Sequence, residues 1–300
     1  MKKGTETESD MLRPVSWTIA GGRVLGPAPF FVVGIVNCTP DSFYDGGLYF
    51  DAGTGISHGL ELLNQGADIV DIGGESTRPF SRRISADEES RRVLPVVHGI
   101  LDQSPDAVVS IDTYRSGVAA QALQAGAQIV NDVSACAFDP ELIRVLADYK
   151  PGYVLMHSRG RPEDMQKDPS YTDVVEEIYA FFETGLDRLI QAGVPQEHIV
   201  LDPGIGFGKL LEHNLELLAN IHRFYALGRP VYMGLSNKSM WGKLLDVASH
   251  NRRTATQVAT GLMAARGVPI HRVHEVEDTV RTLRIVQALH DHAGGRNHGS

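Results

Sequence analysis

The sequence predicts a (β/α)8 barrel, the TIM-barrel architecture, built as a single domain. First, a unit consisting of a short apolar run that ends in a polar residue, followed by an amphipathic helical stretch, occurs eight times along the chain. Second, 300 residues with 42% hydrophobic content can bury one large core. Strands that alternate with helices pair in parallel, so eight units can close into a barrel. An open doubly wound sheet is the alternative.

The two ends of the chain differ in composition from the repeating part. Residues 1–12 are polar and charged and predict a disordered tail, as do the Gly-, His- and Asn-rich residues 293–300. Residues 16–25 alternate around Gly21 and Gly22, a pattern typical of a β-hairpin. We expect this hairpin to close the bottom of the barrel, within a single domain that covers residues 13–292.

The predicted strands and helices follow one another in strict alternation. The strands are expected at residues 30–37, 67–73, 107–112, 128–132, 153–157, 199–202, 231–236 and 270–274. The helices are expected at residues 55–65, 86–101, 116–125, 140–149, 174–192, 212–221, 254–266 and 276–289. Gly66 and Gly126 stand where a helix should end just before the next strand.

Polar residues end most of the predicted strands. The strand-end residues are Asn37, Asp71, Asp112, Asn131, Asp132, the apolar Met156 with His157, Asp202, Ser236 with Lys238, and Arg272 with His274. In a barrel the C-terminal ends of all strands lie on one face, so these side chains should share one rim. Each alone could be a polar cap, but their convergence predicts a ligand site. In IVLDPGIGFGK, residues 199–209, the glycines after Asp202 would let a ligand approach the backbone closely.

Composition excludes several classes of function. The formal net charge is -9 and no Lys/Arg stripe stands out, which argues against a nucleic-acid partner. Cys38 and Cys136 are the only cysteines and have no metal-ligand spacing, which favours a reducing compartment. Without a signal-like or membrane-spanning apolar run, a cytoplasmic protein with no membrane partner is expected.

Seven motifs occur in one order along residues 30–290. They are NCTPDSFYDGG at 37–47, GGESTRP at 73–79, SID at 110–112, NDV at 131–133, DPGIGFGK at 202–209, the serine-lysine-serine pattern around Lys238, and RVHEV at 272–276. With these motifs the chain resembles the dihydropteroate synthase family of folate biosynthesis. The resemblance implies a transferase that condenses 6-hydroxymethyl-7,8-dihydropterin pyrophosphate with p-aminobenzoate, giving 7,8-dihydropteroate and pyrophosphate. It also implies Mg2+ as cofactor, a homodimer formed through the later helices, and a target of sulfonamides.

The resemblance further implies a role for individual residues. The pterin would contact Asp112, Asn131, Met156, Asp202 and Lys238, and the pyrophosphate would contact Asn37, Thr77, Arg78, Arg272 and His274. The p-aminobenzoate would contact Phe43, Pro79, Phe207, Lys238 and Ser239. Asp45, Asp112, Asp202 and Lys238 would be catalytic, and Asn37 would bind the metal. The residue types suit these ligands, because carboxylates and amides match a pterin edge and a guanidinium matches phosphate oxygens.

Two positions depart from the family pattern, and two other functions compete. Asn237 stands where the family usually has Arg, and Phe80 where the second loop commonly has Gly. A barrel that binds methyltetrahydrofolate for methyl transfer to a corrinoid protein would share the pterin contacts, but it would not need Thr77, Arg272 and His274. A non-catalytic pterin sensor is the other alternative, and only Asn237 favours it.

Overall fold

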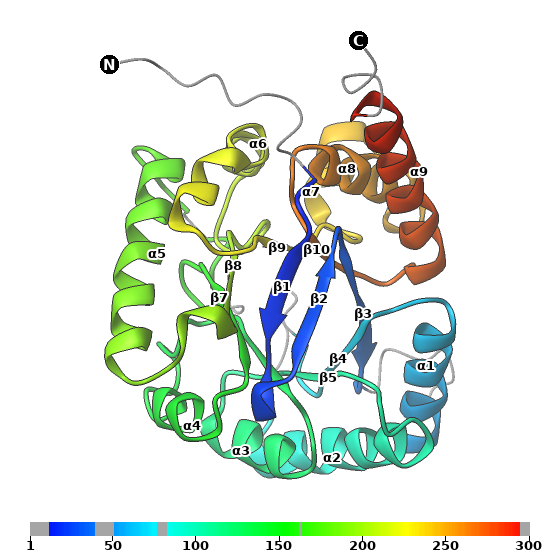
Figure 1. Cartoon of the computed structure of the whole chain (residues 1–300). Coiled ribbons are helices and arrows are strands. Elements are labelled where there is room, and N and C mark those ends of the chain that lie inside the picture. The colour runs from blue at the N-terminus through cyan, green and yellow to red at the C-terminus, as the bar shows by residue number, and fades with distance from the viewer. Residues whose placement is uncertain (1–11, 40–50, 77–82, 162–163, 168, 295–300) are drawn as a thin grey trace.

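Eight parallel strands form a barrel surrounded by helices (Figure 1). The structure is a computed structural model and describes residues 12–39, 51–76, 83–161, 164–167 and 169–294. The strands are hydrogen-bonded in the order β8-β7-β6-β5-β4-β3-β10-β9. A parallel bridge between Leu201 and Val231 joins β8 to the segment that leads into β9, which closes the sheet on itself. The (β/α)8 prediction is therefore confirmed, and the open doubly wound sheet is wrong.

The observed bounds follow the sequence prediction closely. The barrel strands are β3 (Phe31–Asn37), β4 (Ile69–Gly73), β5 (Val109–Asp112), β6 (Ile129–Asp132), β7 (Gly152–Met156), β8 (Ile199–Asp202), β9 (Tyr232–Met233) and β10 (Ile270–Val273). The α-helices are α1 (Ala52–Asn64), α2 (Ala86–Gln103), α3 (Ser116–Gln124), α4 (Leu142–Tyr149), α5 (Val174–Gln191), α6 (Leu211–Ala219), α7 (Ser239–Leu245), α8 (Arg253–Ala265) and α9 (Val276–Gly294). None of the described helices combines the length and the apolarity needed to cross a membrane.

Three segments differ from the prediction. The strand expected at residues 231–236 is reduced to β9, because the chain turns after Met233 and Asn237 adopts a left-handed φ of 56°. The short helix α7, which the sequence analysis did not predict, follows this turn. Helix α9 continues to Gly294, two residues into the stretch expected to be a tail. Residues 1–11 and 295–300 of the predicted tails lie outside the described part of the chain.

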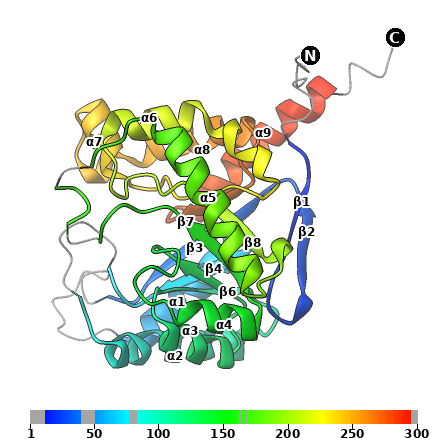
Figure 2. The same cartoon turned by 90° about the vertical axis from the view of Figure 1, so that its left-hand side faces the viewer.

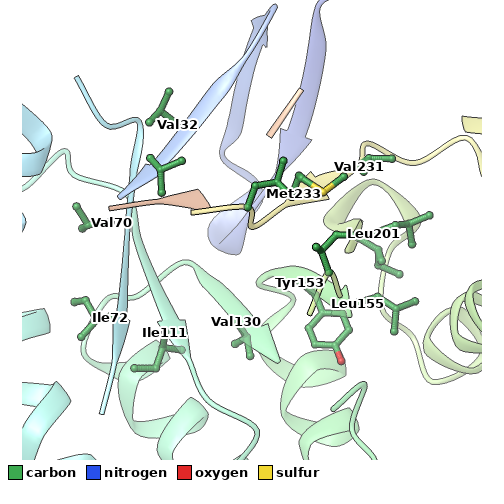
Figure 3. Packing of buried hydrophobic residues seen from close by; sticks show 14 of the residues in the cluster. Val32, Val70, Ile72, Ile111, Val130, Tyr153, Leu155, Leu201, Val231 and Met233 are labelled. Atoms are coloured by element: carbon green, nitrogen blue, oxygen red, sulfur yellow. The ribbon is translucent and has the colours of Figure 1, made fainter. Parts of the chain in front are cut away.

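Side chains that alternate along the strands separate the core into two layers. Figure 3 shows residues that point outward from the strands, such as Val70 on β4, Ile111 on β5 and Leu155 on β7, packed in the layer between sheet and helices. The alternate residues, including Ile69 and Ile129, point into the barrel and form a second apolar cluster. This period of two follows from the pleat of each strand, and it leaves the inward positions at the C-terminal strand ends for polar residues.

The predicted hairpin lies at the end of the barrel that carries the N-terminal ends of the strands (Figure 2). It consists of β1 (Val15–Thr18) and β2 (Val24–Ala28). Trp17 is 1% exposed, packs with Ile19 among the inward residues of the barrel, and donates a hydrogen bond from Nε1 to the carbonyl of His198 at 2.8 Å. A Cβ at Gly152 would lie 2.9 Å from a methyl group of Ile19, so this close approach requires glycine. The hairpin therefore closes the bottom, as predicted.

We expect Trp17→Ala to destabilise the fold by about 3–5 kcal/mol, because it removes a large buried side chain and leaves a cavity under the barrel. Urea unfolding followed by circular dichroism measures this loss. Val24→Ala, at an exposed position of the same hairpin, is the matched control and should change stability by less than about 0.5 kcal/mol. Equal stabilities of Trp17→Ala and the parent chain would show that the hairpin does not help to hold the barrel.

Candidate functional site

The register of the parallel strands brings the predicted rim residues to the same end of the barrel. Asn37 pairs with Gly73, Gly73 with Asp112, and Asp112 with Asn131, so these positions run in one line across β3 to β6. Met156 on β7 pairs in the same way with Asp202 on β8. The polar ends of distant segments thus become neighbours, because parallel strands carry their carboxyl ends to one edge.

Arg272 on β10 is the centre of a buried network inside this end. Its Nε contacts Asp71 Oδ2 at 2.6 Å, and its Nη2 contacts Asp112 Oδ2 at 2.6 Å. Asn131 Nδ2 donates to the same oxygen of Asp71 at 2.9 Å. The sequence analysis assigned Arg272 to pyrophosphate, but here two of its donor groups are directed at carboxylates deeper in the barrel. Four strands are linked by this one set of charge-assisted hydrogen bonds.

Burial changes the protonation of this network. It raises the pKa of Asp112 to about 7; Arg272 opposes that shift and Asp71 adds to it. For Arg272, burial lowers the pKa, but Asp71 and Asp112 outweigh that effect and raise it, so the guanidinium stays charged. Asp112 can therefore either accept or hold a proton near neutral pH, which suits a carboxyl that faces a heterocycle with donors and acceptors.

Asp202 and Lys238 influence each other electrostatically at the same end of the barrel. Asp202 Oδ1 accepts a hydrogen bond from the backbone of Gly204 at 2.7 Å, which fixes the carboxylate at the start of the glycine loop. Burial raises the pKa of Asp202 and lowers that of Lys238 to about 8, and each charge opposes the shift of the other. Lys238 Nζ lies 4.3 Å from the ring centre of Phe207, over its face. The lysine thus links the predicted pterin and p-aminobenzoate contacts.

An apolar cluster faces the polar groups at this end of the barrel. Met156 is buried with Tyr114 and Val133, and the half-buried Phe138 and Phe207 pack against them. The rings of Tyr114 and Phe138 meet edge to face with centroids 5.4 Å apart. A flat ring could bind between such a surface and the hydrogen-bonding groups of the network, because the cluster supplies contact area and the polar groups supply orientation.

Lys209 supports the glycine loop that follows Asp202. Its Nζ lies 2.9 Å from His157 Nδ1 and donates to the carbonyls of Gly204 and Phe207, each at 3.0 Å. Burial, aided by Lys209, lowers the pKa of His157 to about 2, so the neutral ring can accept this hydrogen bond. His157, a predicted rim residue, therefore helps to hold Lys209 against the glycine loop. A lysine that follows a glycine-rich loop was the signal that the sequence offered for this role.

The remaining described candidates lie around the rim. Asn37 is half-buried at the end of β3, and Ser239 is exposed at the start of α7. Ser236 Oγ lies 2.9 Å from His274 Nδ1 and donates to Glu275 Oε2 at 3.0 Å, which holds the histidine just beyond β10. In the described segments, no three His, Cys, Asp or Glu side chains are grouped so that they could hold a metal ion.

Asn237, the first departure from the family pattern, has a structural role of its own. Its φ of 56° is left-handed, a conformation that asparagine tolerates better than most residues. Its Nδ2 donates to Glu275 Oε1 at 3.2 Å. Arg252 Nη1 donates to the carbonyl of Asn237 at 3.3 Å, so a guanidinium from the segment before α8 reaches this turn.

Several predicted residues lie outside the described part of the chain. They are Phe43, Asp45, Thr77, Arg78, Pro79 and Phe80. The flanks of the second loop are described. Glu75 Oε2 accepts hydrogen bonds from Ile84 N at 3.1 Å and from Arg115 Nη2 at 2.8 Å, so Arg115 ties the two flanks together. Arg115 was not predicted from the sequence, because its partners are distant along the chain. Asp71 was predicted only as a strand-end residue.

Comparisons with known proteins agree with this site. A model of the pterin binding enzyme family matches residues 33–274. A dihydropteroate synthase from Synechocystis sp. is 43% identical over 260 residues, which cover 86% of this chain and 90% of that protein. Two solved structures also match. One is the Yersinia pestis dihydropteroate synthase with a sulfonamide drug, with a TM-score of 0.86, 38% identity, and 92% and 100% of the two chains covered. The other is the Xanthomonas albilineans dihydropteroate synthase with 4-aminobenzoic acid, with a TM-score of 0.84, 39% identity, and 91% and 98% covered.

The matched region begins at Val33 within β3 and contains all the other barrel strands. It therefore includes the strand ends that form the site. The chain therefore belongs to the pterin-binding enzyme family and, within it, to the dihydropteroate synthases, which are transferases.

Proposed function

We propose that this dihydropteroate synthase joins 6-hydroxymethyl-7,8-dihydropterin pyrophosphate to p-aminobenzoate at the rim formed by β5, β6, β8 and β10. The observation that carries the proposal is a set of buried and half-buried carboxylate, amide and ammonium groups next to an apolar surface. Asp112, Asn131 and Asp202 supply the polar groups, and Met156 belongs to the apolar surface. A flat heterocycle that carries both donors and acceptors matches this combination.

The pterin would be oriented by its polar edge. Its amine and ring N–H groups donate hydrogen bonds, which Asp202 and Asp112 can accept, while the amide of Asn131 can both donate and accept. Lys238 would donate to the ring carbonyl or a ring nitrogen, and Met156 would pack against the ring face. Because all these groups are held by strand ends or by the glycine loop, the ring would be positioned with little reorganisation of the protein.

The reaction requires little covalent work from the chain. The C–O bond to pyrophosphate breaks, the arylamine nitrogen forms a C–N bond to the same methylene carbon, and the amine then loses a proton. Asp112 and Asp202 would stabilise positive charge that develops on the pterin methylene, while Arg272 and His274 would face the leaving pyrophosphate. Arg272 is already paired with two carboxylates. Pyrophosphate would therefore compete with these carboxylates for the guanidinium.

Mg2+ fits the residues present, with most of its ligands supplied by the substrate. Asn37 offers an amide oxygen at the rim, and Mg2+ in phosphate sites is commonly held by one or two protein oxygens together with phosphate oxygens and water. When bound, the ion would neutralise charge on the pyrophosphate. Asn37 would hold the ion at the end of β3. This strand is the direct neighbour of β10, which carries Arg272 and leads to His274.

The p-aminobenzoate would bind at the outer part of the same rim. Phe207 offers a ring face, Lys238 a positive charge, and Ser239 a hydroxyl at the start of α7. The Xanthomonas albilineans relative with bound 4-aminobenzoic acid supports this choice of substrate. We also expect the enzyme to work in the cytoplasm, because Cys38 and Cys136 are the only cysteines of the chain and both are buried as free thiols.

A second copy of the chain would cover an apolar surface on α8 and α9. Val258 and Leu262 are exposed one helical turn apart on α8, as are Ile285 and Leu289 on α9. Gly261 faces Thr282, so the two helices pack closely and present these side chains together. Exposed apolar patches of this kind are typical of protein interfaces, and we propose that this one forms a homodimer.

The function is tested by mixing both substrates with the purified chain and measuring the formation of 7,8-dihydropteroate and pyrophosphate over time. We expect turnover.

We expect Asp202→Asn to weaken pterin binding roughly 10- to 100-fold, because a buried hydrogen-bond partner of the ring loses its charge. Calorimetric titration with 6-hydroxymethylpterin gives the affinity. Asp139→Asn is the control, since Asp139 accepts hydrogen bonds from Ser116 N and Oγ at the start of α3. It should lower stability and leave the pterin affinity unchanged. Unaltered affinity in Asp202→Asn would remove Asp202 from the pterin site.

Turnover should stop in excess chelator and return with added Mg2+, because the charge on the leaving pyrophosphate would otherwise be incompletely neutralised. Asn37→Ala should raise the Mg2+ concentration that gives half-maximal turnover. Asn220→Ala, at the end of α6, is the control. Full activity of the metal-free enzyme would contradict a role for the ion.

Leu262→Asp should convert a dimer into a monomer, because a charge placed in an apolar interface must be desolvated without a partner. Sedimentation velocity measures the oligomeric state. Leu215→Asp, at an exposed position of α6, should leave it unchanged. A parent chain that sediments as a monomer at micromolar concentration would rule out this interface.

A further inference from the structure

Asp71 is the most deeply buried acidic group of the charged network, and it has no place among the predicted substrate contacts. Its residue is 0% exposed on β4, in the interior of the barrel. One of its oxygens, Oδ2, is shared by Arg272 Nε and Asn131 Nδ2. The first of these partners belongs to the predicted pyrophosphate set and the second to the predicted pterin set. One oxygen atom therefore links the groups for the two halves of a single substrate.

The described residues give Asp71 no other strong partner. Its second oxygen, Oδ1, is buried without a hydrogen-bond partner among the described residues, and the same holds for Ser110 Oγ and the hydroxyl of Tyr232. Arg272 is also the only cation that pairs with Asp71 in the described part of the chain. A buried carboxylate costs free energy unless it is well paired, so a group placed only for folding would be expected to satisfy both oxygens.

Asp112 cannot hold Arg272 in the same way. It too contacts the guanidinium, at 2.6 Å, but it is partly exposed and lies at the very end of β5, where the pterin would bind. When a ligand donates hydrogen bonds to Asp112, Asp71 remains the anchor of the arginine.

We infer that Asp71 is a positioning residue for the whole pterin pyrophosphate. Its Oδ2 fixes Arg272 Nε so that the other end of the guanidinium can turn toward the leaving group, and it fixes the amide of Asn131 against the pterin edge. This inference rests on the proposed function for the identity of the substrate. It assigns to Asp71 a role in binding two ligand fragments, the pterin ring and the pyrophosphate, without contact with either.

The test compares Asp71→Asn with the parent enzyme in steady-state kinetics and in direct binding. We expect the KM for the pterin substrate to rise on the order of tenfold or more, while the KM for p-aminobenzoate changes less than about twofold. Calorimetry with 6-hydroxymethylpterin and, separately, with inorganic pyrophosphate should show that both affinities fall. Asp68→Asn is the matched control, because Asp68 precedes the same strand at the opposite end of the barrel and accepts from Val32 N. It should leave both affinities unchanged.

A double-mutant cycle with Arg272→Gln separates positioning from general loss of structure. If Asp71 acts through Arg272, then Asp71→Asn should lower pyrophosphate affinity much less in the Arg272→Gln background than in the parent, because coupled residues are not additive. The double variant removes both charges of the Asp71–Arg272 pair and leaves only Asp112, which can take up a proton near neutral pH. Comparing it with Arg272→Gln therefore measures the effect of Asp71→Asn even if Asp71→Asn alone fails to fold.

Additive effects in the cycle, or equal losses for both substrates together with a lower melting temperature, would overturn the inference. A parent chain that binds 6-hydroxymethylpterin but forms no dihydropteroate would refute the proposed function alone. In that case the two binding titrations would still decide the role of Asp71.

Discussion

A charge inside a barrel must be paired, and this constraint shapes the end of the molecule that carries the site. Arg272 enters the interior on β10 and is stabilised there by Asp71 and Asp112 from two other strands. In a low-dielectric interior an unpaired guanidinium or carboxylate would cost far more than a surface charge. The three residues therefore have to remain together, and Asn131 joins them through Asp71. The polar rim is a connected network because its members could not be buried separately.

The opposite end of the barrel has the complementary character. Trp17 and Ile19 from the hairpin fill the space between the inward side chains of the strands, and the Trp17 indole satisfies its one donor with a backbone carbonyl. An apolar, closed bottom lets the barrel keep its interior dry below the charged layer. The apolar packing below the network gives it a surrounding of low dielectric constant, which keeps the electrostatic interactions there strong.

Groups outside the rim hold the loops that surround it. Lys209 binds two carbonyls of the glycine loop as well as His157, and Arg115 ties Glu75 to Ile84 on the two sides of the second loop. Both cations are used for backbone and side-chain contacts within the protein. A site that binds small, flat and charged ligands needs this kind of support, because small displacements of the binding groups weaken binding.

The sequence by itself determined the barrel and most of the rim. Apolar runs such as residues 199–202 end on a carboxylate, and this local pattern recurs with helices in between, so strand, helix and shared face follow from periodicity alone. It also placed Asp112, Asn131, Asp202 and Arg272 at one end of the sheet, because parallel strands carry their carboxyl ends to one edge, whereas closure into a barrel rather than an open doubly wound sheet was established by the structure.

Only the tertiary structure decided what these residues contact. Arg272 and Asp71 are 201 positions apart, and no local pattern could show that the guanidinium is held by carboxylates in the free protein. In the same way, tertiary contacts shortened the strand at β9 and gave Asn237 its left-handed turn. Periodicity reports which face a residue occupies, whereas the partner of a buried charge depends on strand register and on the side chains that other strands bring to the same depth.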